Sequence, residues 1–206
     1  ETEAVLRHFS LRAGGAIAIS SITASTIGSG VFKETLGLKI ISDAPQLIEI
    51  VPIVLICSPI FGALAIFFMY SIRLGGKTSK ATKLSPTYQI LFAALICGSI
   101  GLFVTEILGL GTNEMNNIFA NQYEIIFLFI ILIGKVFMTS LCIGFGFFGG
   151  IFAPALYVGA AGGGFIANSL IVLGFSLSLP ALALAGTAAV GAVAIGAPIA
   201  VSYTHL

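Results

Sequence analysis

The sequence predicts an all-helical integral membrane protein, and its charge content is the first reason. Of the 206 residues, 58% are hydrophobic and 8% are charged, with nine Lys or Arg against eight Asp or Glu. An average soluble domain carries about 25% charged residues, so the few charges here could not cover a soluble surface of this size. The composition excludes a soluble enzyme, a disordered chain and an electrostatic nucleic-acid binder.

The length of the uncharged runs is the second reason. Residues 136–206 contain no Asp, Glu, Lys or Arg, and a helix needs only about 20 apolar residues to cross a bilayer. Other runs predict spans at residues 13–32, 50–72, 86–105 and 125–143. The runs do not alternate apolar and polar residues as β-barrel strands do. Helices that satisfy their own backbone hydrogen bonds are therefore expected.

The charges between the spans predict an orientation. Residues 73–83, from Arg73 to Lys83, carry four positive charges and no acid, and short basic loops favour the cytoplasmic side. Residues 106–124 carry three acids and no Lys or Arg, which fits the opposite side. Residues 7–12 are basic and lie two crossings before the loop at 73–83. We therefore expect a multi-pass protein whose 73–83 loop is cytoplasmic.

The pattern changes after residue 143 and predicts a broken helix. Residues 144–150 read Gly-Phe-Gly-Phe-Phe-Gly-Gly, too rich in glycine for a plain lipid-facing helix. Pro154 suits a first helical turn, because the amide hydrogen that it lacks would have no partner there. A helix that begins inside a membrane presents free amides and the positive end of its dipole, which favour an anion. Residues 149–154 are a candidate anion site; the alternative is a glycine-rich packing turn.

Lys135 is the one charge in the later apolar runs. An intramembrane charge is costly and suggests a function, so Lys135 would supply positive potential to an anion path. The alternative is a lysine that snorkels to the membrane surface from near a helix end. Three cysteines and two histidines show no metal-ligand spacing, so we expect neither a metal site nor a cofactor, and the cysteines are interpreted as buried small apolar residues.

Residues 149–162 closely resemble a signature of the CLC family of chloride channels and transporters. They read Gly-Gly-Ile-Phe-Ala-Pro-Ala-Leu-Tyr-Val-Gly-Ala-Ala-Gly, a Gly-x-Phe-x-Pro turn followed by Leu and a glycine-rich helix. Residues 3–12 resemble the end of the family's helix H and the start of helix I, residues 108–111 the turn after helix K, and residues 186–199 helix O. The resemblance implies tilted and broken transmembrane helices over residues 1–200, as part of a CLC-type domain. Residues 201–206 do not continue the pattern and are interpreted as a tail foreign to the family.

The resemblance implies chloride transport, with chloride as the ligand. In the family, the Gly-x-Phe-x-Pro turn lends backbone amides to the central chloride. The matching donors here are Ile151 and Phe152, and the residues that shape the loop are Gly149, Gly150 and Pro154. No residue is expected to be catalytic, because the chain after Glu124 has only Lys135 as a charged group.

Two positions near the start of the chain bear on the type of transport. Glu3 falls on an acid found widely in the family and is a candidate internal acid. Ala4 occupies the place of the proton-relay Glu of many family antiporters, so the resemblance slightly favours a channel over a chloride/proton exchanger. It also implies a homodimer, with residues 13–32 near the interface. The remaining alternative is a secondary transporter of another anion or small solute through the same broken helix.

Overall fold

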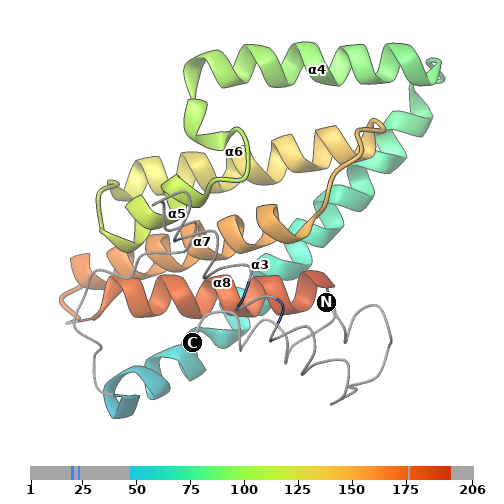
Figure 1. Cartoon of the computed structure of the whole chain (residues 1–206). Coiled ribbons are helices and arrows are strands. Elements are labelled where there is room, and N and C mark those ends of the chain that lie inside the picture. Colours follow the sequence, from blue (N-terminus) through green and yellow to red (C-terminus); the bar gives the residue numbers. More distant parts are fainter. Residues whose placement is uncertain (1–19, 21–22, 24–46, 176, 196–206) are drawn as a thin grey trace.

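Helices form all the regular structure in the described part of the chain. The computed structural model describes residues 20, 23, 47–175 and 177–195. Glu3, the basic segment 7–12, nearly all of the predicted span 13–32 and the tail 201–206 lie outside these residues. The elements in order are α3 (Leu47–Ala81), α4 (Pro86–Phe103), η1 (Thr105–Ile107), α5 (Thr112–Phe119), α6 (Ile125–Gly144), α7 (Phe152–Val172) and α8 (Leu179–Ile195) (Figure 1).

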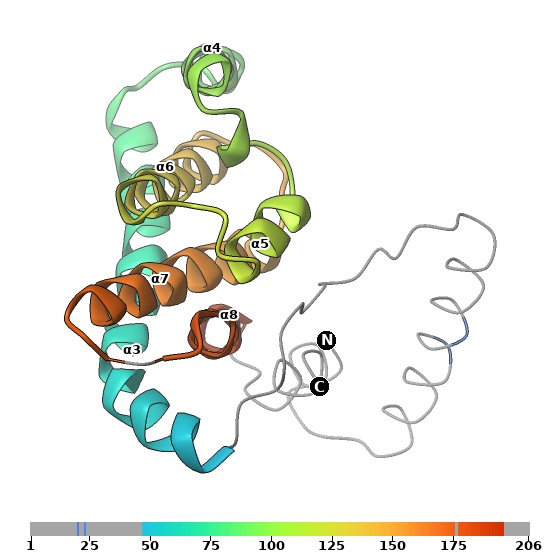
Figure 2. The same ribbon diagram turned by 90° about the vertical axis from the view of Figure 1, so that its left-hand side faces the viewer.

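Four helices lie one beside the next, and a fifth crosses them. Figure 1 shows α4, α6, α7 and α8 with their long axes in roughly one direction. Figure 2 looks nearly down these axes and shows α3 running along the side of the stack. The long α3 contacts α6, α7 and α8, while the short α5 packs against α7 and α8. The expected architecture of tilted, interrupted helices is confirmed by this arrangement.

Four helices are long and apolar enough to cross a membrane. They cover Ile50–Ala81, Pro86–Phe103, Ile125–Gly144 and Phe152–Val172. Three of them confirm the spans predicted to begin at residues 50, 86 and 125, and the fourth follows the glycine-rich interruption. The apolar α8 is shorter than these spans, and it packs against α7 and α3.

Glycines let α7 and α8 approach backbone to backbone. A Cβ on Gly159 would overlap the carbonyl of Gly186, and a Cβ on Gly163 would overlap the carbonyl of Leu182. Gly159 and Gly163 lie one helical turn apart on the same face of α7, the spacing that supports close helix packing in lipid. Tyr157 and Val158, on the turn before Gly159 and Gly163, are fully buried.

The expected loop at residues 73–83 is wrong for most of its length, because α3 continues to Ala81. The helix has 35 residues and is therefore about 52 Å long, whereas the hydrocarbon core is about 30 Å thick. Its basic end can thus leave the hydrocarbon while still helical. The Ser79 hydroxyl donates to Gln89 Oε1 (2.7 Å) and the Gln89 amide donates to the Ser79 carbonyl (3.2 Å), which ties this end to α4.

Candidate functional site

The break between α6 and α7 is a short glycine-rich segment. The α6 helix ends at Gly144. The amides that follow donate hydrogen bonds to carbonyls in its last turn, from Phe145 to Leu141 (3.0 Å) and from Phe147 to Cys142 (3.0 Å). Gly146 has a φ of 97°, a conformation that favours glycine. Residues 147–150 then continue without regular structure. The interruption predicted from the sequence is therefore confirmed.

The start of α7 leaves backbone donors free. Ile151 is the N-cap, Phe152 is the first helical residue, and Pro154 lies in the first turn. The first bond of the helix runs from the Ala155 amide to the Ile151 carbonyl (3.0 Å). The amides of Phe152 and Ala153 precede that bond and lack a helical acceptor, and no side chain caps this end. The helix dipole adds partial positive charge at the same place.

Lys135 lies in the middle of α6 and is buried, with 3% of its surface exposed. Its Nζ donates to the carbonyls of Ile107 (2.8 Å) and Gly109 (2.7 Å), and it lies 4.8 Å from the centre of the Tyr157 ring. The ammonium group therefore points into the protein, and the interpretation of a lysine snorkelling from a helix end is wrong. Carbonyl dipoles and an aromatic face solvate the charge without cancelling it.

The end of η1 and the turn after it present the two carbonyls that hold Lys135. Gly109 and Gly111 have φ values of 63° and 76°, which confirms the turn expected at residues 108–111. A Cβ on Gly111 would overlap the Tyr157 ring. The Tyr157 hydroxyl in turn donates to the Glu106 carbonyl (3.0 Å). This turn, α6 and α7 are thus joined around one buried charge.

A pocket of about 300 Å³ opens beside Lys135. It brings together four of the residues proposed for the site: Lys135, Gly149, Gly150 and Pro154. The other residues that line it come from α4, η1 and the turn after it, α6 and the interruption: Cys97, Ile107, Leu108, Gly109, Met138, Thr139, Cys142, Ile143, Phe147 and Phe148. The structure therefore places the positive charge and the glycine-rich interruption at one cavity.

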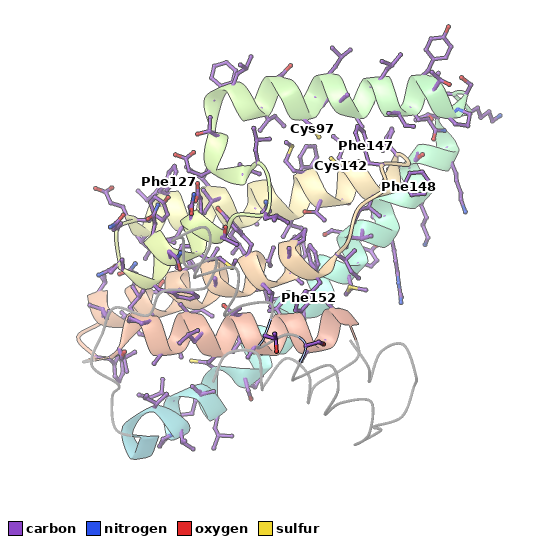
Figure 3. All side chains as sticks on the ribbon, in the orientation of Figure 1. Cys97, Phe127, Cys142, Phe147, Phe148 and Phe152 are labelled. Atoms are coloured by element: carbon purple, nitrogen blue, oxygen red, sulfur yellow. The ribbon has the colours of Figure 1, made fainter. Side chains whose placement is uncertain are left out.

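Ile151 and Phe152 are at the helix start but do not line this pocket. Figure 3 shows Phe152 on the side of the α7 start away from Phe147 and Cys142. Phe147 and Phe148 line the pocket, and Phe148 is fully exposed. The third phenylalanine of the interruption, Phe145, instead packs its ring 5.8 Å from that of Phe92 on α4. Glu3 lies outside the described residues.

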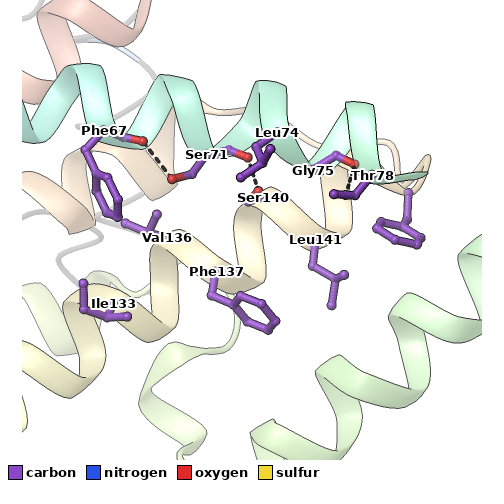
Figure 4. Close-up of a pocket in the computed structure, with 11 residues that line it drawn as sticks. Phe67, Ser71, Leu74, Gly75, Thr78, Ile133, Val136, Phe137, Ser140 and Leu141 are labelled. Carbon is purple, nitrogen blue, oxygen red and sulfur yellow. Dashed lines mark hydrogen bonds between the residues drawn. The ribbon is translucent and has the colours of Figure 1, made fainter. Parts of the chain in front are cut away.

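A second pocket of similar size lies between α3 and α6, and its lining combines apolar side chains with three hydroxyl groups (Figure 4). Its hydroxyl groups all donate hydrogen bonds to backbone carbonyls of the protein. Ser71 donates to the Phe67 carbonyl (2.8 Å), Thr78 to the Gly75 carbonyl (2.8 Å) and Ser140 to the Ser71 carbonyl. No charged side chain lines this pocket among the described residues. It therefore offers an anion far less than the pocket beside Lys135.

Sequence reasoning missed the partners of Lys135. The carbonyls of Ile107 and Gly109 are 28 and 26 residues away along the chain, and every residue has a carbonyl, so no sequence signal distinguishes them. Tyr157 was visible inside the glycine-rich signature, but its ring contact with Lys135 depends on how α6 and α7 cross. The two closely spaced glycines, Gly109 and Gly111, are the available hint that this turn is constrained.

These features define a multi-pass, all-helical membrane protein with a helix that starts inside the fold beside a buried positive charge. The chain belongs to the voltage gated chloride channel family, whose family model matches residues 2–204. The resemblance stated for residues 149–162 is thereby confirmed at the level of the family.

Curated relatives agree with this family. The chain is 28% identical over 202 residues to the H(+)/Cl(-) exchange transporter ClcA of Vibrio campbellii, covering 93% of this chain and 42% of the relative. It is 31% identical over 164 residues to ClcA of Vibrio cholerae serotype O1, a match that covers 76% of this chain and 35% of the relative. An uncharacterised protein of Methanocaldococcus jannaschii is 29% identical over 106 residues, which cover 48% of this chain and 27% of that protein. The chain spans less than half the length of these relatives.

Proposed function

We propose that this chain forms part of a pathway that carries chloride across a membrane, with an anion bound between Lys135 and the start of α7. The buried Lys135, which lines the same pocket as Gly149, Gly150 and Pro154, carries the proposal. The family membership and the names of the Vibrio relatives support chloride as the ion.

The chemistry of the site suits a weakly held anion. In a medium of low dielectric, the Lys135 charge attracts an anion more strongly than it would in water. The amides of Ile151 and Phe152 lie at the start of α7, next to this pocket and outside its lining, and would supply directional donors, with Gly149 and Gly150 allowing close approach and Pro154 fixing the first turn. Conduction requires an ion to leave as well as bind, and Lys135 is already engaged by two carbonyls.

The type of transport is a second part of the proposal. Ala4 in place of a proton-relay Glu favours a channel, whereas the relatives are named exchangers. We retain the channel as the slightly favoured form, and Glu3 as the candidate internal acid if protons are coupled. A chloride gradient imposed across vesicles distinguishes the two: an exchanger drives protons in the opposite direction to chloride, and a channel drives none.

Further parts of the proposal concern orientation and assembly. The basic end of α3, which is free of acids from Arg73 to Lys83, would face the cytoplasm. The protein would act as a homodimer, with residues 13–32 near the contact. The other candidate function is secondary transport of a different anion or small solute through the same broken helix. Flux of that solute without chloride would favour it.

Replacement of Lys135 tests the proposed site. Lys135→Met keeps an unbranched side chain of similar size and removes the charge, so we expect chloride flux to fall about tenfold or more and half-saturating chloride to rise about tenfold, equivalent to about 1.4 kcal/mol of binding. Chloride efflux from vesicles that contain the full-length protein is the measurement. Lys135→Arg keeps the charge and should retain much of the flux.

The matched control is Lys77→Met, which removes an exposed lysine from α3 outside this pocket. Its chloride flux should equal that of the unmodified protein. Wild-type flux and chloride dependence in a well-folded Lys135→Met protein would contradict the proposal.

A further inference from the structure

Two cysteine thiols meet across α4 and α6. The Sγ atoms of Cys97 and Cys142 lie 3.3 Å apart (Figure 3). Both are free thiols and both side chains are partly exposed. The distance is within hydrogen-bond range for sulfur, but it is longer than the roughly 2.05 Å of a disulfide bond.

The thiol pair continues the stripe by which α4 contacts α6. Ala93 on α4 is buried against Leu141 on α6 and Phe145 just after its end, and Ile96 and Cys97 pack on the same cluster. The ring of Phe92 lies 5.8 Å from that of Phe145. Residues 92, 93, 96 and 97 share one face of a helix. Cys97 is therefore held opposite Cys142 by this stripe.

A small reagent can reach the pair from the pocket beside Lys135. Cys97 and Cys142 both line that pocket, together with Phe147, Phe148 and Lys135. The third cysteine, Cys57, is buried in a separate cluster with Phe61, Ala167, Leu179 and Leu182. The structure thus provides one thiol pair and one isolated thiol in the same chain.

We propose that Cys97 and Cys142 form an intramolecular disulfide when the protein meets a peroxide. One deprotonated thiol attacks a peroxide oxygen, the O–O bond breaks, and the leaving hydroxide takes up the proton to form water. The second thiol attacks the resulting sulfenic sulfur, the S–S bond forms, the S–O bond breaks, and a second water leaves. The two sulfurs lose two electrons, which the peroxide gains.

The bond would fix α4 over the pocket. Only 11% of the α4 span is buried inside the protein, and α4 contacts the rest mainly through α6 and η1. The backbone carbonyl of Cys142 also accepts a hydrogen bond from the Phe147 amide (3.0 Å), so this residue is linked directly to the interruption before α7. A Cys97–Cys142 disulfide would therefore join α4 to the edge of the cavity that contains Lys135.

Peptide mapping of the full-length protein in lipid vesicles tests the proposal. The protein is treated with hydrogen peroxide and then denatured in the presence of N-ethylmaleimide, so that every remaining thiol is blocked, before it is digested for mass spectrometry. We expect a cross-linked peptide pair that contains Cys97 and Cys142, lighter by two hydrogen atoms than the separate peptides. Dithiothreitol should release it, and Cys57 should carry the blocking group.

Serine variants give the matched controls. Cys57→Ser should form the same cross-link at the same rate. Cys97→Ser should form none and should leave Cys142 as a sulfenic acid that dimedone traps. The proposal is overturned if Cys97 and Cys142 both remain free under peroxide that oxidises a small reference dithiol, or if the cross-link joins either of them to Cys57 or to another chain. These readouts do not depend on chloride transport.

Discussion

Lys135 can remain charged inside the fold because backbone carbonyls replace its water. The carbonyls of Ile107 and Gly109 accept from Nζ at 2.8 and 2.7 Å, and the Tyr157 ring lies on another side. Neutral dipoles solvate an ammonium group but leave its net charge in place. The carboxylate of Glu114 on α5 also acts on Lys135 electrostatically, but its buried Oε2 forms no hydrogen bond, so the positive potential left for an anion depends on both the neutral dipoles and this acid.

The glycines of the turn at residues 108–111 support this arrangement in different ways. Gly109 has a φ of 63° and open space where a Cβ would lie, whereas Gly111 has a φ of 76° and no room beside Tyr157. Gly109→Ala should lower the free energy of unfolding by about 1 to 2 kcal/mol, from the left-handed backbone alone. Gly111→Ala should lower the free energy of unfolding further, because the added methyl group also displaces the Tyr157 ring.

Thermal unfolding in detergent, followed by circular dichroism, compares the two variants. Equal unfolding temperatures for Gly111→Ala and Gly109→Ala would show that the contact with Tyr157 contributes nothing.

The sequence alone predicts part of the site at this scale. Lys135 stands out because it is a lone charge in an apolar run, and Pro154 marks a first helical turn. What it cannot predict is the direction in which Nζ points, since that depends on a turn 26 residues away. The snorkelling alternative failed for this reason.

At the scale of elements, the contact between α7 and α8 depends on glycines, which have no side chain to hold the two backbones apart. Gly163 faces the carbonyl of Leu182 and the Cα of Ala183. Gly163→Ala should destabilise the protein by about 1 to 3 kcal/mol, because the helices must separate to admit the methyl group. Gly98→Ala makes the same chemical change on α4, where nothing lies within 4 Å.

The two substitutions should therefore change the free energy of unfolding differently, with only Gly163→Ala lowering it. Gly98→Ala should be neutral or stabilising by up to about 1 kcal/mol, because alanine favours a helix. Denaturant unfolding of both proteins in the same detergent checks this. A Gly163→Ala protein as stable as Gly98→Ala would rule out close backbone packing of α7 on α8.

Helix boundaries were predictable where charge and hydropathy change together. The starts of α4 and α6 fall at Pro86 and Ile125, as expected. The sequence does not predict the end of α3 at Ala81, because a basic, glycine-containing segment is typical of a loop. Two tertiary effects override that local signal: Gly75 lets α3 approach α6 closely, and Ser79 bonds to Gln89 beyond the helix end.

At the scale of the molecule, the arrangement explains how a chain with so few charges can offer an anion site. The crossing of α3 over α6, α7 and α8 holds the stack together (Figure 2). Within it, the interruption at residues 145–151 brings Pro154, in the first turn of α7, to the pocket beside Lys135. The sequence predicted the interruption, but the pocket required the relative positions of α4, α6 and the turn after η1.

Bromide is a chloride substitute that scatters X-rays anomalously, and it tests the proposed site most directly. Crystals of the full-length protein grown in bromide should show an anomalous peak within hydrogen-bond distance of the amides at Ile151 and Phe152, on the side of the pocket that Lys135 lines. The peak should weaken in Lys135→Met crystals. Ordered density for residues 149–154 with no peak beside them, or bromide bound only elsewhere, would contradict the proposed anion site.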